Sequence, residues 1–327
     1  RNASDVHIVV GHPVLFRIDG VLTESGKELL SAESAAKFVR TILGDENWQR
    51  FEKEREIDVS YAVDAGVRLR VNCHYERGNV GLVARIIPRD IPSLEDLNLD
   101  AIAKSLCMLP SGLILFTGPT GAGKSTSLAS MIQYINQTRS ASIVTLEDPI
   151  EFLFPKGKCV IRQRQYGDDF TSFPEALKRV LRQDPNIVMV GEMRDLETIA
   201  AALTLAETGH LIFATLHTPN AVQSIDRIVD VFPPHQQHQI RTQFSLSLKA
   251  VIAQALLPKK DGGRVAVREV LINTPAVANI IRDDRVQELA SVLQTNAEAG
   301  MRTFEKEAKK LLDAGEITIE TFERMKN

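Results

Sequence analysis

The 327-residue chain lacks the sequence features of membrane, secreted and zinc-binding proteins. No apolar run approaches the ~20 residues that a helix needs to cross a bilayer, and the first residues contain no apolar signal core. The three cysteines, Cys73, Cys107 and Cys159, are far apart and form no CxxC pair, which argues against a structural zinc site and favours a reducing compartment. We therefore expect a cytoplasmic protein without direct membrane insertion.

The chain also has few aromatic residues and almost no net charge. Aromatic residues make up 6%, and 39 Lys and Arg residues oppose 42 Asp and Glu residues, for a net charge of -3. Proteins that coat nucleic acid need an excess of cations, and a single-strand channel needs stacking aromatics along a basic groove. No basic run with interleaved aromatics occurs, so the sequence argues against nucleic acid as a partner.

The length predicts about two domains, at roughly 100–200 residues per domain, and residues 1–91 have the pattern of an α+β domain. In the strand expected at 67–75, Val67, Leu69 and Val71 share one face, and Arg68 and Arg70 lie on the other. The other expected strands cover 6–10, 14–18, 57–63 and 80–87, and the expected helix runs from Ser31, a candidate N-cap, to Leu43, before Gly44.

Pro88 and Pro92 interrupt this pattern, and we interpret residues 92–97 as an interdomain linker. From residue 98, continuous apolar strands alternate with helices, which predicts a parallel sheet covered on both faces. Beyond about residue 236 the pattern predicts a helical subdomain, apart from one strand at 265–272 and including a charged helix after Thr303. The other expected strands cover 112–117, 142–146, 187–190 and 211–215, and the expected helices cover 124–136, 174–181 and 198–207.

A phosphate loop is the most specific motif in the chain. Residues 118–125 read Gly-Pro-Thr-Gly-Ala-Gly-Lys-Ser and match G-x-x-x-x-G-K-[ST], after an apolar strand and before an amphipathic helix. Backbone N–H groups of such a loop converge on phosphate oxygens, the lysine reaches the β- and γ-phosphates, and the serine binds Mg²⁺. We therefore expect ATP and Mg²⁺ as ligands. The residues expected to bind the nucleotide are Gly118, Pro119, Thr120, Gly121, Ala122, Gly123, Lys124, Ser125 and Thr126.

Carboxylates follow two of the expected strands. Glu192 comes after the apolar strand Ile187–Val190, which is the Walker B form, and we expect it to hold Mg²⁺ together with Ser125. Glu147, Asp148 and Glu151 follow the strand at 142–146, where a carboxylate can position or deprotonate the attacking water. A solvated acidic turn is the alternative interpretation of this second group.

Two histidines flank the expected strand Leu211–Thr215. His210 precedes the strand and His217 follows it. A histidine beside a γ-phosphate can donate a hydrogen bond to it, whereas a lone histidine is more often a structural residue with a satisfied ring. The sequence pattern alone leaves both interpretations open.

Four blocks of the sequence together resemble the secretion and type IV pilus motor ATPases. Gly118–Ser125 is similar to the Walker A motif of that family, and Val144–Phe152 is similar to its Asp box. Arg182–Asp195 is similar to its Walker B region, and Glu207–Ala221 to its His box. The resemblance covers essentially the whole chain and points to the retraction branch of the family, which drives twitching motility.

The resemblance implies roles for three glutamates and two histidines of these blocks. It makes Glu151 the catalytic base, with Glu147 close by, and makes Glu192 the Walker B carboxylate. His217 is then the contact of the γ-phosphate, with His210 as its partner. These roles follow from the family and not from the spacing of the residues.

The resemblance also implies the architecture and the partners. Arg70 and Arg85 match two arginines of the N-terminal domain that reach the nucleotide, although each by itself could be an exposed charge on a sheet face. The implied fold is α/β: a PAS-like domain, then a RecA-like ATPase domain over residues 98–327 with a helical C-terminal region. The implied protein is a homohexamer that hydrolyses ATP to power pilus retraction and acts on an inner-membrane platform protein at the pilus base.

A short C-terminal segment, Ala276–Asp283, could transmit force. Val277, Ile280 and Ile281 have helical spacing and form one apolar face, while Arg282 and Asp283 lie off that stripe. The pair off the stripe would face another subunit or the pilus platform. A core helix is the alternative, because apolar helical spacing usually marks packing.

Other functions compete with pilus retraction at this point. A motor for pilus extension or secretion belongs to the same superfamily, although such motors usually carry a tetracysteine insert that this chain lacks. A RecA-like nucleic-acid ATPase is the candidate from another class, and it would show ATPase activity stimulated by DNA. A nucleotide-binding regulator without turnover is a further alternative.

Overall fold

The computed structural model describes residues 3–18, 21–63, 67–87, 90–99 and 101–326. The chain folds into two compact units. One unit contains Arg1–Asp90 together with Glu151–Leu153, and the other contains Ile91–Ile150 and Phe154–Asn327. Pro88 and Arg89, at the start of the segment that the sequence marks as a boundary, lie outside the described residues.

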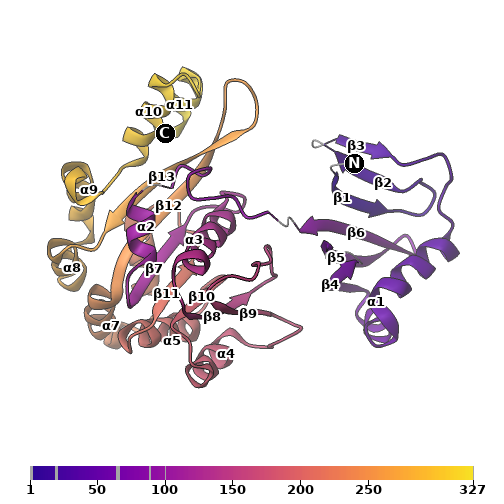
Figure 1. Ribbon diagram of the computed structural model, residues 1–327, viewed down its shortest axis with the longest axis horizontal. Coiled ribbons are helices and arrows are strands. Elements are labelled where there is room, and N and C mark those ends of the chain that lie inside the picture. The colour runs from indigo at the N-terminus through magenta and orange to yellow at the C-terminus, as the bar shows by residue number, and fades with distance from the viewer. Residues whose placement is uncertain (1–2, 19–20, 64–66, 88–89, 100, 327) are drawn as a thin grey trace. The chain divides into compact units, whose positions relative to one another are not determined.

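The N-terminal unit is an antiparallel sheet with one long helix on one face (Figure 1). The strands run in the order β3-β2-β1-β6-β5-β4. Helix α1 (Ala32–Glu54) begins at Ser31, whose side chain accepts a hydrogen bond from Ser34 N, as the sequence predicts. Gly44 interrupts the helix with φ 67°. The strands are β1 (Ala3–Ile8), β2 (Leu15–Ile18), β3 (Val21–Glu24), β4 (Glu56–Val63), β5 (Val67–Glu76) and β6 (Asn79–Ile87).

The two faces of this sheet differ in polarity. Val71 and Ala84 pair across β5 and β6 and are buried in the core that α1 covers. Arg70 and Arg85 also pair with each other, one residue out of phase, so they lie on the opposite face. This alternation is the one that the sequence predicts for β5.

The second unit contains a seven-stranded sheet in the order β13-β12-β7-β11-β10-β8-β9. All neighbouring strands are parallel except the antiparallel pair β12 and β13 at one edge. The strands are β7 (Gly112–Thr117), β8 (Ser142–Glu147), β9 (Val160–Gln165), β10 (Ile187–Val190), β11 (Leu211–Thr215), β12 (Leu248–Pro258) and β13 (Arg264–Ile272).

Helices cover both faces of this sheet (Figure 1), as continuous apolar strands require. One core joins the sheet to α2 and α3, and a second core joins its other face to the helices α4 to α9. A smaller cluster packs α10 and α11 against β12 and β13. The helices are α2 (Ala101–Cys107), α3 (Lys124–Thr138), α4 (Phe173–Val180), α5 (Leu196–Glu207), α6 (Ala221–Asp230), α7 (Pro234–Ser247), α8 (Pro275–Arg282), α9 (Leu289–Thr295), α10 (Phe304–Asp313) and α11 (Ile319–Lys326).

The prediction of a helical region from about residue 236 is wrong for β12. This strand reads Leu-Lys-Ala-Val-Ile-Ala-Gln-Ala-Leu-Leu-Pro, and its alanines and leucines favour a helix in isolation. It forms a strand because Leu248 to Ala253 pair with β7 and are mostly buried in the sheet. Continuous helical structure therefore begins only at Pro275. Strands β3 and β9 were also not predicted from the sequence.

Helix α8 supports the core interpretation of the segment Ala276–Asp283. Val277 and Ile281 are fully buried and Ile280 is nearly so, within the core that covers one face of the sheet. Ile281 is thus a packing residue and not a force-transmitting contact. Arg282 and Asp283 are half-exposed and form an ion pair with each other at 3.4 Å.

None of the helices within the described residues has the length and apolar content that crossing a membrane requires.

Candidate nucleotide site

The candidate site lies where the parallel strands of the second unit end. Loops leave β7, β10 and β11 at this carboxyl edge, and β8 ends there at Glu147. Backbone hydrogen bonds tie the loops together: Gly191 N donates to Leu146 O at 2.7 Å, and Leu216 N donates to Phe116 O at 3.0 Å. Ligands of open α/β sheets bind at this edge. The structure therefore brings the Walker A loop, Glu147 and Glu192 to one side of the sheet.

The phosphate loop has the backbone conformation that its glycines permit. Gly118, Gly121 and Gly123 all have positive φ, at 136°, 80° and 80°. A Cβ atom on Gly118 would collide with the backbone carbonyl oxygen of Gln254, so no side chain fits there. Gly123 is the N-cap of α3, whose first-turn N–H groups and dipole favour an anion. The predicted loop, strand and helix are confirmed in this geometry.

Lys124 is held inside the loop. Its ammonium group is buried and donates hydrogen bonds to the carbonyl oxygens of Gly118 at 2.6 Å and Pro119 at 3.0 Å. These contacts place the positive charge at the base of the loop, beside the N-terminus of α3. A cation in that position can reach a bound phosphate without a large movement of the backbone.

The two glutamates of the Asp box differ in environment. Glu147 is buried, and its Oε1 accepts hydrogen bonds from Thr145 Oγ1 at 2.6 Å and Gln163 Nε2 at 3.1 Å. Glu151 lies beyond Ile150 and is exposed. A buried, doubly hydrogen-bonded carboxylate suits a fixed role, whereas an exposed one can accept a proton from water. This difference is consistent with assigning the base to Glu151, which stays a prediction.

Glu192 is the centre of a charged group at the end of β10. Its Oε2 pairs with Arg194 at 2.8 Å, and its Oε1 accepts a hydrogen bond from His217 Nε2 at 3.0 Å. Burial works to raise the pKa of Glu192, but the hydrogen bonds from Arg194 and His217 hold that pKa below its ordinary value. Glu192 is therefore ionised at neutral pH, and it fixes the orientation of the His217 ring.

The structure does not bring His210 to this group. His210 precedes β11 and His217 follows it, and a strand of this length is about 16 Å long at ~3.3 Å per residue. His210 lies at the opposite, amino edge of the sheet, where its carbonyl oxygen accepts a hydrogen bond from Gly112 N at the start of β7. Its Nδ1 donates to Leu205 O at 3.0 Å. The expectation that His210 is the partner of His217 is wrong within one chain, because the strand separates them.

Arg85 and Arg70 belong to the polar face of the N-terminal sheet. Arg85 Nε donates to Asp5 Oδ1 at 2.8 Å, and its side chain is 69% exposed whereas that of Asp5 is 6% exposed. Burial works to raise the pKa of Asp5, but hydrogen bonds from Arg85 and Ser4 hold that pKa below the ordinary value. The ionised Asp5 orients Arg85 and leaves most of its guanidinium open to solvent.

Most of the chain matches a known protein family. A family model described as a type II/IV secretion system protein matches residues 1–262. The chain belongs to this family. It is 43% identical to the type IV pilus retraction ATPase PilT of Pseudomonas aeruginosa over 98% of this chain and 93% of the relative. It is also 41% identical to the type IV pilus ATPase PilU of the same organism, over 98% of this chain and 84% of the relative.

A solved structure of this secretion family resembles the whole chain. It is the crystal structure of the pilus retraction motor PilT with bound ADP, and it matches with a TM-score of 0.93 and 43% identity. The match covers 98% of this chain and 92% of the other. The fold described above is thus the fold of a nucleotide-binding member of the family.

Oxygen ligands for Mg²⁺ are present at the site. Ser125 supplies a hydroxyl group in the first turn of α3, and Glu192 supplies an ionised carboxylate after β10. Among the described residues, no group of three or more His, Cys, Asp or Glu side chains is arranged to hold a metal. This donor set fits an ion that keeps several waters and takes its other ligands from substrate phosphates, as Mg²⁺ does.

Arg194, which the structure places on Glu192, was not predicted from the sequence. A cavity of about 330 Å³, lined by Glu192 and Arg194 together with Asp148, Tyr166 and Asp195 among others, was not predicted either. Arg194 stands two residues after Glu192 in the Walker B block, and its position near a strand-end carboxylate is the signal that could have identified it. The cavity could not be found from the sequence, because its walls come from separate segments.

Proposed function

We propose that this chain is a motor ATPase that hydrolyses ATP to power the retraction of a type IV pilus. The observation that carries the proposal is the 43% identity to the retraction ATPase PilT across 98% of the chain. The phosphate loop at the carboxyl edge of the sheet supplies the chemistry that such a motor needs.

In this proposal the loop residues bind and orient the triphosphate. Backbone N–H groups of Gly121 to Ser125 surround the phosphates, and Lys124 offsets their charge. Ser125 and Glu192 would hold Mg²⁺, which would supply positive charge to offset that of the phosphates. The His217 ring is held by the hydrogen bond between its Nε2 and Glu192, and it contacts the γ-phosphate through its other nitrogen, Nδ1.

Glu151 is the proposed general base. It accepts a proton from the attacking water, while Glu147 fixes the end of β8 through Thr145 and Gln163. Arg85 and Arg70 stabilise the charge that develops on the transferred phosphoryl group, of their own chain or of a neighbouring copy. This division leaves each charged residue with one task.

We further propose the assembly and the cell location that the resemblance implies. The domains are a PAS-like domain over residues 1–91 and a RecA-like ATPase domain over 98–327. Residues 92–97, expected as a linker, cluster with the second unit, where Leu94 is buried in the core. The antiparallel order of the N-terminal strands, with α1 on one face, supports the PAS-like assignment. The chain forms a homohexamer in the cytoplasm, at the inner membrane, and acts on a platform protein at the base of the pilus.

Genetics tests the direction of force. We expect deletion of the gene to leave cells with excess surface pili and no twitching motility, since assembled pili could no longer be withdrawn. The wild-type gene restores motility and a Lys124→Ala gene does not. Cells without pili would contradict retraction and indicate an extension motor.

A second candidate is a pilus ATPase of the PilU kind, because that relative is 41% identical over 98% of the chain. A pilus ATPase that does not itself drive retraction predicts that deletion leaves twitching at least partly intact. Turnover that rises on addition of single-stranded DNA would instead support a nucleic-acid ATPase, and binding without turnover would support a regulator.

Arg85→Ala is expected to slow ATP hydrolysis by about 10²-fold or more while changing nucleotide affinity far less, because a cation beside the phosphoryl group acts mainly in the transition state. Steady-state kinetics and the dissociation constant for ATP measure the two effects separately. The melting temperature should fall, because the substitution leaves the buried Asp5 carboxylate without its Arg85 partner, so thermal unfolding is measured alongside.

Arg17→Ala is the matched control for this prediction. Arg17 also lies beside Asp5, with its Nε 3.9 Å from Asp5 Oδ2, but it has no proposed contact with nucleotide. The Arg17→Ala variant should hydrolyse ATP at the rate of the parent. Equal loss in both variants would assign the effect to Asp5 and the sheet, and would refute a role of Arg85 at the phosphate.

A further inference from the structure

One buried polar side chain, in the middle of an apolar strand, packs against the phosphate loop. Gln254 lies on β12, one residue beyond Ala253, which pairs with Thr117 at the end of β7. Only 2% of Gln254 is exposed. Its backbone carbonyl oxygen blocks a Cβ on Gly118, and its side-chain nitrogen would lie 3.0 Å from a Cβ on Gly123. Gln254 therefore lies against both Gly118, at the start of the loop, and Gly123, near its end.

The partners of Gln254 fix which way its amide points. Arg268 Nε donates to one terminal atom at 2.8 Å, and Ser127 Oγ lies 2.8 Å from the same atom. An arginine can only donate, so this atom is the carbonyl oxygen Oε1. The other terminal atom is then the NH₂ group, which donates to the carbonyl oxygen of Ala122 at 2.6 Å.

The hydrogen bond to Ala122 orients the loop. In a trans peptide the C=O and the following N–H point in opposite directions. Because the Ala122 carbonyl is drawn toward Gln254, the N–H of Gly123 points away from Gln254. Gly123 is the N-cap of α3, so this N–H is one of the donors at the anion-binding end of the helix.

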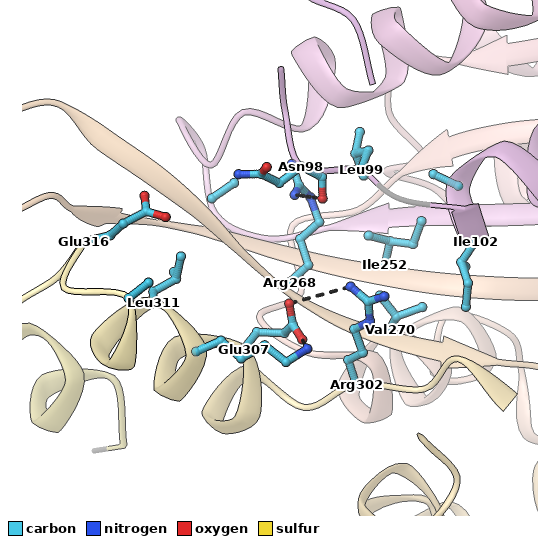
Figure 2. Close-up of a pocket in the computed structure, with 14 residues that line it drawn as sticks. Asn98, Leu99, Ile102, Ile252, Arg268, Val270, Arg302, Glu307, Leu311 and Glu316 are labelled. Atoms are coloured by element: carbon cyan, nitrogen blue, oxygen red, sulfur yellow. Dashed lines mark hydrogen bonds and ion pairs between the residues drawn. The ribbon is translucent and has the colours of Figure 1, made fainter. Parts of the chain in front are cut away.

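Arg268 holds Gln254 in turn. The two residues are direct cross-strand partners on β12 and β13. Arg268 is 8% exposed, and its Nη1 donates to Leu97 O at 2.8 Å. Figure 2 shows Arg268 between Asn98 and Glu307, in the wall of a cavity of about 280 Å³. Burial lowers the pKa of Arg268 to about 10, so it keeps its charge at neutral pH.

We propose that Gln254 is a positioning residue for nucleotide binding, held in place by Arg268 and Ser127. We call this chain of contacts, Arg268 to Gln254 to Ala122, the Arg268–Gln254 relay. A buried arginine is costly, and a well-packed apolar residue would serve packing alone at least as well. The relay instead sets the direction of a loop peptide, to which phosphate binding is sensitive. The proposal rests on the proposed function, because it assumes that the loop binds ATP.

Gln254→Glu tests the relay with almost no change of shape. The glutamate keeps an acceptor for Ser127 and gains an ion pair with Arg268, but it loses the N–H donor to Ala122. We expect the dissociation constant for ATP to rise by about tenfold or more, since the loss leaves a carbonyl unpaired and adds negative charge near the phosphates. The melting temperature should fall only modestly, because the ion pair with Arg268 offsets part of the stability lost with the hydrogen bond to Ala122.

Arg268→Lys tests the other end of the relay. A lysine keeps the charge but cannot contact Gln254 and Leu97 in the same way, because it lacks the planar fork of donors. Arg268→Lys should also weaken ATP binding. The double variant should bind ATP no more weakly than Gln254→Glu alone, because both substitutions act through the hydrogen bond from Gln254 to Ala122. Should Gln254→Glu fail to fold, the affinity of Arg268→Lys decides alone: an unchanged value refutes the relay.

Asn273→Asp is the matched control. The Asn273 amide donates to two backbone carbonyls, of Ser245 and Leu248, both at 2.8 Å, and Leu248 pairs with Leu113 at the amino end of β7. This substitution removes the same kind of donor at the opposite edge of the sheet. It should lower the melting temperature without changing ATP affinity.

The experiment uses the full chain, with ATP and ADP titrated into each purified variant and thermal unfolding measured alongside. An ATP dissociation constant for folded Gln254→Glu within about twofold of the parent value would overturn the relay, as would additive losses in the double variant. A parent protein that binds neither nucleotide would refute the proposed function itself, so the two failures are distinguishable.

Discussion

Lys124→Ala is expected to abolish tight ATP binding and, with it, turnover. The ammonium group is buried in the loop and donates to Gly118 O and Pro119 O, so the substitution removes the positive charge that the loop itself holds. Loss of a charge-assisted contact to phosphate costs roughly 10²-fold or more in affinity. Titration of a fluorescent ATP analogue and a phosphate-release assay measure the two losses.

Lys178→Ala is the control for this variant. Lys178 is an exposed residue of α4 that pairs with Glu175, so its loss removes a positive charge without touching the loop. It should bind and hydrolyse ATP as the parent does. A folded Lys124→Ala variant that binds the analogue as tightly as the parent would show that the loop is not the phosphate site.

Glu151→Gln is expected to retain ATP binding and to lose turnover. An amide cannot accept the proton of the attacking water, and the loss of a general base typically costs ~10²–10⁴ in rate. Because Glu151 is exposed, the substitution should leave the melting temperature almost unchanged. Single-turnover hydrolysis with enzyme in excess separates the chemical step from product release.

Glu147→Gln distinguishes the two ends of the Asp box. A glutamine at this position still offers an oxygen to Thr145 and Gln163, so the end of β8 should keep its structure. If Glu147→Gln is inactive and Glu151→Gln is active, the base is Glu147. If both variants are as active as the parent, neither glutamate of the Asp box takes part in hydrolysis.

The Walker B group illustrates how the structure changes the expected result of a substitution. The sequence predicts Glu192 as a metal ligand, and the structure adds that Arg194 and His217 both bind its carboxylate. Replacing Glu192 therefore frees two neighbouring side chains as well as removing the proposed metal ligand. Kinetic losses in a Glu192 variant measure the group as a unit and not one residue.

Local sequence determined most elements of the second unit. The strands at 112–117, 187–190 and 211–215 have the predicted bounds, because short continuous apolar runs that alternate with helical patterns are typical of buried parallel strands. The phosphate loop was equally predictable, since its glycines specify a backbone that other residues rarely adopt. These signals are local, so the sequence carries them without the fold.

Tertiary structure alone decided the features that depend on distant segments. Strand β12 has helix-favouring residues and becomes a strand only because β7 and β13 pair with it. His210 and His217 are close in sequence, yet the strand between them carries them to opposite edges of the sheet. Gln254 meets the phosphate loop through a hydrogen bond to Ala122, far away along the chain, and local patterns contain no information about such contacts.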